Sequence, residues 1–198
     1  MLLVDLDSAM TDAFRTLPVA REINGAAFDD PRVKVHNEDA FKFLEESKDS
    51  FDLVIVDFPD PSNYAVGKLY TDAFYHLLRE RLSFRGVGVV QSTSPQYARE
   101  SFWCIVQTLE TAGFHTAPLH VYVPSFGDWG FVLIGGENLA PPGSLRIEPS
   151  KLRWLDAAGL PELFRFPRDT GRVPTVTNRL NDQKLVAIYS REWGVFTR

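Results

Sequence analysis

The chain has 198 residues, of which 44% are hydrophobic and 24% charged, and its formal net charge is -5. A chain of this length can bury a core, and its acidic balance argues against a protein that binds nucleic acid. The single cysteine, Cys104, excludes an internal disulfide, which fits a protein from the reducing cytoplasm or one that simply needs no disulfide. No apolar run approaches the ~20 residues of a membrane-spanning helix, and no clustering of Cys and His predicts a metal site.

The first quarter of the chain predicts two short strands, each followed by a helix. Residues 1–5 are apolar and end in Asp5, and a helix is expected to follow as far as about Arg21. A second strand is expected at 33–36, and Asp39 is expected to cap the helix after it. Both strands are therefore followed by acidic residues at their carboxyl ends.

The most informative stretch, 51–61, reads FDLVIVDFPDP. Its apolar, mostly β-branched run predicts a buried strand of a parallel sheet, and the two prolines require the chain to turn directly after it. Asp57 and Asp60 therefore follow the carboxyl end of a buried strand. Ligands bind at this end of the strands in open α/β sheets, so the two acids are candidate functional residues.

The remaining elements continue the alternation of strands and helices that is typical of an α/β fold with a doubly wound sheet. Helices are expected at 71–82 and 95–111, and strands at 86–91, 115–123 and 129–134, the last two as an antiparallel hairpin. We predict a first domain at 1–135, a linker at 136–149 and a small C-terminal helical appendage at 150–198, with helices near 151–158 and 178–193.

Each acid also has an ordinary structural interpretation. Asp60, between two prolines, is typical of a turn, whereas Asp5 and Asp39 alone are typical of helix caps or solvated strand ends. Asp57 is less easily explained in this way. The occurrence of four acids at successive strand ends favours a ligand site. Among the aromatic residues, Tyr64 and Tyr70 are placed to cover a cleft, although tyrosines are common in loops, and three are expected in the core: Phe126, Trp129 and Phe131.

Taken together, these residues resemble the polyamine aminopropyltransferases, the spermidine and spermine synthases. The D-x-x-D-P element is the most specific part of the resemblance, which covers about two thirds of the chain. The other matching segments are 4–7, 39–41, 69–75, 86–91 and 129–131. The loop at 124–131 and the tail at 166–180 are similar to a bacterial branch in which a soluble synthase domain follows several membrane helices.

The resemblance implies a Rossmann-like, methyltransferase-type fold that transfers an aminopropyl group from decarboxylated S-adenosylmethionine to putrescine or a related amine. The nucleoside is a co-substrate, no cofactor is bound permanently, and a homodimer is expected. The location implied is cytoplasmic, as such or as the cytosolic domain of a membrane-anchored parent. The implied roles are Asp57 as general base, Asp60 and Gln91 in the amine cleft, Asp5 on the ribose hydroxyls, and Asp39 with Ala40 at the adenine.

The implied reaction explains why paired acids are needed. An alkylamine is protonated at neutral pH, since its pKa lies near the ~10.4 of lysine, and it must lose a proton before it can attack carbon. A carboxylate buried at a strand end beside a second carboxylate becomes a stronger base. Two acids also favour a dicationic substrate. Positioning is expected to supply much of the rate, because a sulfonium is already a good leaving group.

The sequence departs from the resemblance at its beginning. In the family a Gly-rich strand and loop precede the segment that matches residues 4–5, and an N-terminal β-domain lies before them. We therefore expect a sheet truncated before its first strand, and weak or no turnover by the chain alone. Two alternatives stay open: an S-adenosylmethionine-dependent methyltransferase on the same fold, and a non-catalytic module for interaction or oligomerisation.

Overall fold

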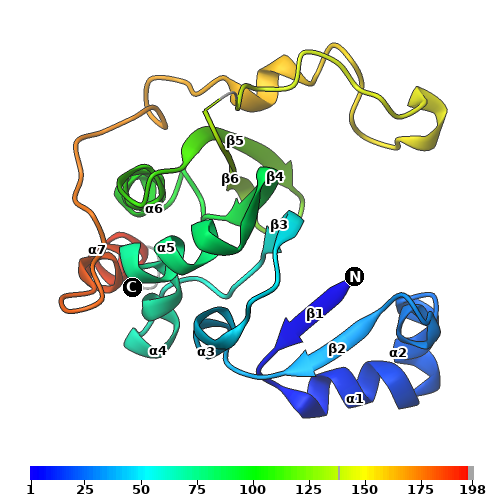
Figure 1. Cartoon of the computed structure of the whole chain (residues 1–198). Helices are drawn as coiled ribbons and strands as arrows, with labels where there is room; N and C mark the ends of the chain where they lie inside the picture. The colour runs from blue at the N-terminus through cyan, green and yellow to red at the C-terminus, as the bar shows by residue number, and fades with distance from the viewer. Residues whose placement is uncertain (138, 196–198) are drawn as a thin grey trace. The chain divides into compact units, whose positions relative to one another are not determined.

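The structure is a computed structural model that describes residues 1–137 and 139–195 (Figure 1). The chain divides into two compact units, Met1–Lys48 and Asp49–Arg198. Each unit is described by itself. None of the described helices is long and apolar enough to cross a membrane.

The first unit is built on a small parallel sheet. Its strands β1 (Leu2–Asp5) and β2 (Lys34–Asn37) pair so that Asp5 lies beside Asn37. The expected single helix to Arg21 is divided, because Leu17 precedes a proline and takes an extended conformation. The helical elements are α1 (Ser8–Thr16), α2 (Pro18–Ile23), η1 (Ala27–Asp29) and α3 (Ala40–Glu46).

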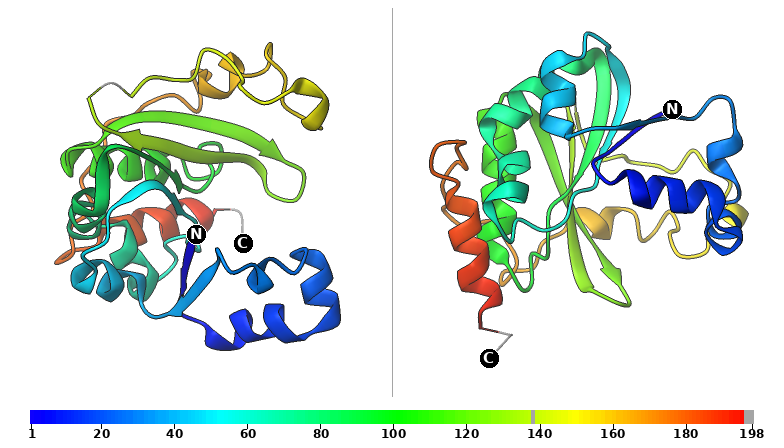
Figure 2. Two further views of the ribbon diagram at one scale, coloured as in Figure 1. Left: turned by 45° about the vertical axis from the view of Figure 1, so that its right-hand side comes forward. Right: turned by 90° about the horizontal axis from the view of Figure 1, so that it is seen from below.

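The second unit contains a four-stranded sheet in the order β3-β4-β6-β5 (Figure 2). Its strands are β3 (Phe51–Val56), β4 (Leu82–Gln91), β5 (His115–Val123) and β6 (Gly127–Gly135). Strands β3 and β4 run parallel, as the buried apolar run predicted. Strands β5 and β6 form the predicted antiparallel hairpin, and β6 also pairs antiparallel with β4.

The helices of this unit bury one face of the sheet. Inward-facing Val56, Val90 and Val132 are at most 6% exposed, whereas Leu53 and Ile55 on the opposite face are 64% and 70% exposed. Helices α5 and α6 lie on the buried face. The helical elements up to α6 are α4 (Tyr64–Gly67), η2 (Lys68–Tyr70), α5 (Asp72–Arg81), which Thr71 caps, and α6 (Arg99–Thr111).

The C-terminal segment differs from its predicted secondary structure. The helix expected near 151–158 is wrong: the segment instead has two short 3₁₀ turns, η3 (Pro149–Lys151) and η4 (Pro161–Phe164). Between them the Asp156 side chain accepts a hydrogen bond from the Gly159 amide at 2.7 Å, a local turn that competes with a helix. The second expected helix, α7 (Lys184–Trp193), starts six residues later than Asn178.

Asn178 lies outside α7 because its backbone and side chain form hydrogen bonds that join the C-terminal segment to the rest of the second unit. Its amide nitrogen donates to the Thr108 hydroxyl at 2.9 Å, and its side chain donates to the Tyr70 carbonyl at 3.0 Å. Its side-chain oxygen accepts from the Leu185 amide at 3.1 Å, at the start of α7. Residues on both sides of the predicted linker thus belong to one compact unit, and the predicted domain boundaries stay predictions.

Candidate functional site

A cavity of about 660 Å³ lies in the second unit where β3 and β4 end. Its walls come from the turn after β3, from the last residue of β4 and from the β5–β6 hairpin. The polar side chains that line it are Asp57, Asp60 and Gln91, and the aromatic ones include Phe126, Trp129 and Phe131. The structure therefore brings together three of the residues predicted for the amine cleft.

Asp60 is half-buried and accepts three hydrogen bonds. Its Oδ1 accepts from Nε2 of Gln91 at 3.0 Å. Its Oδ2 accepts from the hydroxyl of Thr93 at 3.0 Å and from that of Tyr189 at 2.8 Å. A carboxylate offers about four acceptor positions, so one position remains, on Oδ1. Asp60 is thus more than a turn acid, because its orientation is fixed by three side chains from two separate segments.

Gln91 is 7% exposed, and its amide is held at both ends. Its Oε1 lies 3.0 Å from the Tyr70 hydroxyl, which also lies 3.0 Å from the Pro59 carbonyl oxygen. Burial, and then the negative charges nearby, raise the pKa of Tyr70 well above its usual range, so this phenol keeps its proton. With Oε1 facing Tyr70, the NH₂ group of Gln91 faces Asp60.

Thr93 reaches Asp60 from a strained backbone. Its φ angle is 59°, in the left-handed region that β-branched residues rarely adopt, and it is fully buried. Its carbonyl accepts from the Gly130 amide at 2.7 Å, and a Cβ at Gly130 would lie 2.8 Å from that oxygen. Such strain costs about 1–3 kcal/mol and concentrates at functional sites.

Asp57 differs from Asp60 in its surroundings. The expected burial of Asp57 is wrong, since its side chain is exposed at the mouth of the cavity. Strand β3 ends at Val56, so Asp57 is the first residue beyond the strand. Within residues 1–137 and 139–195 its carboxylate has no hydrogen-bond partner. Its acceptor positions are therefore open to a bound molecule.

The three aromatic residues expected in the core instead line the cavity. Gln91 ends β4 opposite Phe131, and the hairpin continues past this point to the Val123–Gly127 pair. Trp129 thus lies on the part of the hairpin that extends beyond β4. The rings of Phe126 and Trp129 lie 5.2 Å apart, and Phe126 is 59% exposed. Both residues line the cavity, where aromatic rings can attract a cation.

Tyr64 lies away from this group. It is the first residue of α4, it is 66% exposed, and it is not among the described residues that line the cavity. Its role in binding the substrate stays a prediction.

The acids predicted for the nucleoside lie in the first unit. The Asp5 carboxylate accepts from the Asp7 amide at 2.7 Å, and Asp39 caps α3 by accepting from the Phe41 amide at 2.9 Å. Because Asp5 pairs with Asn37, both acids lie at the same edge of the two-stranded sheet. Ala40 is the first residue of α3. The structural role expected of Asp39 as an N-cap is confirmed, and the nucleoside roles stay predictions.

Comparison with known proteins establishes the family. The model of the spermine/spermidine synthase domain matches residues 1–141. The chain belongs to the spermine/spermidine synthase family. It is 49% identical over 192 residues to the polyamine aminopropyltransferase of Leptospira interrogans, covering 97% of this chain and 38% of that protein. It is 44% identical over 191 residues to polyamine aminopropyltransferase 1 of Streptomyces coelicolor, covering 96% of this chain and 36% of that protein.

Solved structures of this family share the fold. A spermidine synthase in complex with the transition state analogue AdoDATO matches 94% of this chain and 61% of that chain, with a TM-score of 0.68 and 20% identity. The enzyme from Thermotoga maritima matches with a TM-score of 0.67 and 19% identity, over 94% of this chain and 60% of that one. The predicted Rossmann-like α/β fold class is confirmed. The chain spans little more than a third of the length of the curated relatives it matches.

Two residues of the site were missed at the sequence level: Thr93 and Tyr189. Tyr70 was expected to cover a cleft, and the structure instead buries it against Gln91. The polar run after β4, residues 91–94, was a local signal for Thr93. Tyr189 is 129 residues from Asp60, and nothing near it in the sequence indicates their contact. Over the part of the chain that the structure describes, no group of His, Cys, Asp and Glu side chains could hold a metal ion.

Proposed function

We propose that the chain performs spermidine synthase-like aminopropyl transfer, from decarboxylated S-adenosylmethionine to putrescine or a related amine. One observation carries the proposal: Asp57 and Asp60 line a single cavity together with Gln91 and three aromatic rings. An anionic cleft with aromatic walls favours an alkyl diammonium ion through charge and cation–π attraction.

Asp60 binds the acceptor amine. Its Oδ2 is occupied by Thr93 and Tyr189, whereas Oδ1 has one acceptor position beside Gln91. An ammonium N–H that fills this position completes the hydrogen bonding of the carboxylate. The other end of the diamine is then directed along the cavity toward the reacting carbon.

Asp57 removes the proton. Its carboxylate has no competing hydrogen-bond donor among the described residues, and it takes one proton from the attacking ammonium. The freed nitrogen lone pair forms a bond to the aminopropyl carbon next to the sulfonium. The carbon–sulfur bond breaks, its electron pair goes to sulfur, and neutral methylthioadenosine leaves. The positive charge passes to the new secondary ammonium.

The first unit binds the nucleoside of the co-substrate. Asp5 accepts hydrogen bonds from the ribose hydroxyls, and Asp39, with Ala40 beside it, binds the adenine amino group. The location of both acids at one edge of the β1–β2 sheet supports these roles, since nucleotides bind at the carboxyl ends of parallel strands. We further propose a cytoplasmic location and a homodimer.

The proposal is tested by isothermal titration of putrescine into the chain and into Asp60→Asn. Loss of the charge at Asp60 is expected to weaken binding at least ~10-fold, as for a charge-assisted hydrogen bond. The control is Asp169→Asn, which removes the same charge from an exposed site and should bind like the wild type. Equal loss in both variants would show that only net charge matters and would contradict an amine site at Asp60.

A further inference from the structure

The hydroxyl of Tyr189 donates a hydrogen bond to Oδ2 of Asp60 at 2.8 Å, from a helix near the C-terminal end of the chain. We propose that Tyr189 is a positioning residue for amine recognition: it fixes the Asp60 carboxylate so that only Oδ1 is open to the substrate ammonium. This inference rests on the proposed function, because it gives Tyr189 its role through Asp60.

In the contact between Tyr189 and Asp60, the tyrosine hydroxyl donates the hydrogen bond and the carboxylate accepts it. Burial, and then the negative charge of Asp60, raise the pKa of Tyr189 well above its usual range, so the phenol is neutral at physiological pH. An ionised carboxylate can only accept, and the Tyr189 proton therefore points at Oδ2. Hydrogen bonds to a carboxylate are stronger than those between neutral groups.

Helix α7 is held firmly enough to direct this hydroxyl. The Glu192 carboxylate accepts from the backbone amides of Glu100 and Ser101, at 2.7 and 3.0 Å, and from the Ser101 hydroxyl at 2.6 Å. These donors are the first turn of α6, where a carboxylate is favoured by the helix dipole. Figure 2 shows α7 beside α6.

Apolar contacts complete the support of α7. Leu185 and Ile188 are at most 6% exposed, so one face of the helix is buried in the unit. The ring of Tyr189 lies 5.9 Å from that of Trp193, which lies 5.8 Å from Tyr97. The side chain therefore has little freedom to leave Asp60.

The three donors to Asp60 have different effects on its two oxygens. Thr93 and Tyr189 occupy both acceptor positions of Oδ2, whereas Gln91 occupies one of Oδ1. Without the Tyr189 hydroxyl, Oδ2 regains an open position that water can fill, and the carboxylate is held by two donors. A substrate ammonium then meets two competing acceptor positions instead of one, and its attachment is less well directed.

The test compares Tyr189→Phe with Tyr122→Phe, which removes a hydroxyl from a tyrosine that is 63% exposed. Putrescine affinity, measured by calorimetry, is expected to fall about 5- to 15-fold in Tyr189→Phe, the loss of one hydrogen bond to a charged group. It should be unchanged in Tyr122→Phe. In an Asp60→Asn background, Tyr189→Phe should have no further effect, a result that simple loss of packing does not give.

A second measurement detects the hydrogen bond between Tyr189 and Asp60 in the absence of a ligand. The pH titration of the ¹³Cζ NMR signal of Tyr189, assigned by its loss in Tyr189→Phe, should show a pKa well above the ~10 of an ordinary tyrosine, and Asp60→Asn should lower it. A Tyr189 that titrates near ~10 overturns the inference. Putrescine binding that is intact in the wild type and unchanged in Tyr189→Phe also overturns it and leaves the proposed function standing. No putrescine binding by the wild type overturns the proposed function, and with it the role in amine recognition.

Discussion

Nε2 of Gln91 donates a hydrogen bond to Oδ1 of Asp60 at 3.0 Å, and the opposite end of the same amide faces the Tyr70 hydroxyl at the same distance. The amide thus links a buried phenol to the carboxylate at the cavity wall. Tyr70 is fully buried and stays protonated, so it determines which end of the amide meets Asp60. A buried core residue, Tyr70, therefore helps to orient the carboxylate that we propose binds the amine.

Replacing Gln91 by Met keeps the size of the side chain and removes both of its hydrogen bonds. We expect the free energy of unfolding to fall by about 1–3 kcal/mol, because Tyr70 and Asp60 each lose a partner in a mostly buried place. Chemical denaturation measures this change. Gln96→Met, at an exposed position, is the control and should stay within ~0.5 kcal/mol of the wild type.

Two substitutions at Thr93 separate the contribution of its hydroxyl group to putrescine binding from that of its side-chain shape. Thr93→Val removes the donor to Asp60 and keeps the branched side chain, whereas Thr93→Ser keeps the donor. We expect Val to weaken putrescine binding several-fold and to lower stability by about 1–2 kcal/mol, since a buried bond to a charged group is lost. Ser should retain most of the affinity. Equal affinities for Val and Ser would show that the hydroxyl contributes nothing.

Asn178 is expected to be essential for docking the tail. Asn178→Ala removes the donor to the Tyr70 carbonyl and the acceptor for the Leu185 amide, both buried. Unfolding free energy should drop by at least ~2 kcal/mol, and hydrogen exchange in α7 should rise. The matched control is the exposed Asn181→Ala. If exchange in α7 is the same in both variants, Asn178 does not hold this helix.

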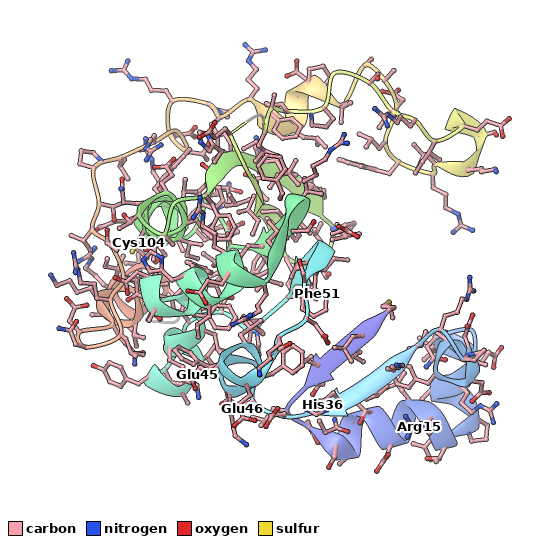
Figure 3. All side chains as sticks on the ribbon, in the orientation of Figure 1. Arg15, His36, Glu45, Glu46, Phe51 and Cys104 are labelled. Carbon is pink, nitrogen blue, oxygen red and sulfur yellow. The ribbon has the colours of Figure 1, made fainter. Side chains whose placement is uncertain are left out.

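Stability is expected to decline in alkaline solution through Cys104, which lies on α6 (Figure 3). Burial raises the pKa of its thiol to about 12, against ~8.5 in an unfolded chain. The folded state therefore binds the proton more tightly, and the stabilisation is complete below pH ~8.5 and is lost as the pH rises toward 12. Between pH 8 and 10 the wild type should lose about 2 kcal/mol more unfolding free energy than Cys104→Ala. Parallel pH profiles of the two proteins would contradict this assignment.

The local features of the fold were predictable, because they follow from periodicity and caps. The run Leu53–Val56 indicated a parallel strand, and Thr71 indicated the start of α5, and both are confirmed. The expected burial of the whole run was wrong, because Val56 on one face is buried whereas Leu53 and Ile55 on the other face are exposed. Asp57 and Asp60 were found because prolines end the strand beside them. The helix expected near 151–158 failed because a side-chain turn at Asp156 replaces helical hydrogen bonds there.

The remaining parts of the site depend on contacts between distant residues. Tyr189 meets Asp60 because Asn178 and Glu192 dock the C-terminal segment on η2 and α6. Trp129 lines the cavity because the hairpin extends beyond β4, which is a matter of strand register. Aromatic residues of a hairpin look alike in sequence whether they are buried or line a cavity, so the expectation of a core position was wrong for them.

The most direct measurement is the formation of methylthioadenosine from decarboxylated S-adenosylmethionine and putrescine, with the chain in excess over the nucleoside. The account predicts product formation, matched one to one by the aminopropylated amine, and a rate at least ~100-fold lower in Asp57→Asn, the usual size of general base catalysis. Equal rates for the wild type and Asp57→Asn would contradict the account, as would methylated amine formed from S-adenosylmethionine in place of the aminopropyl product.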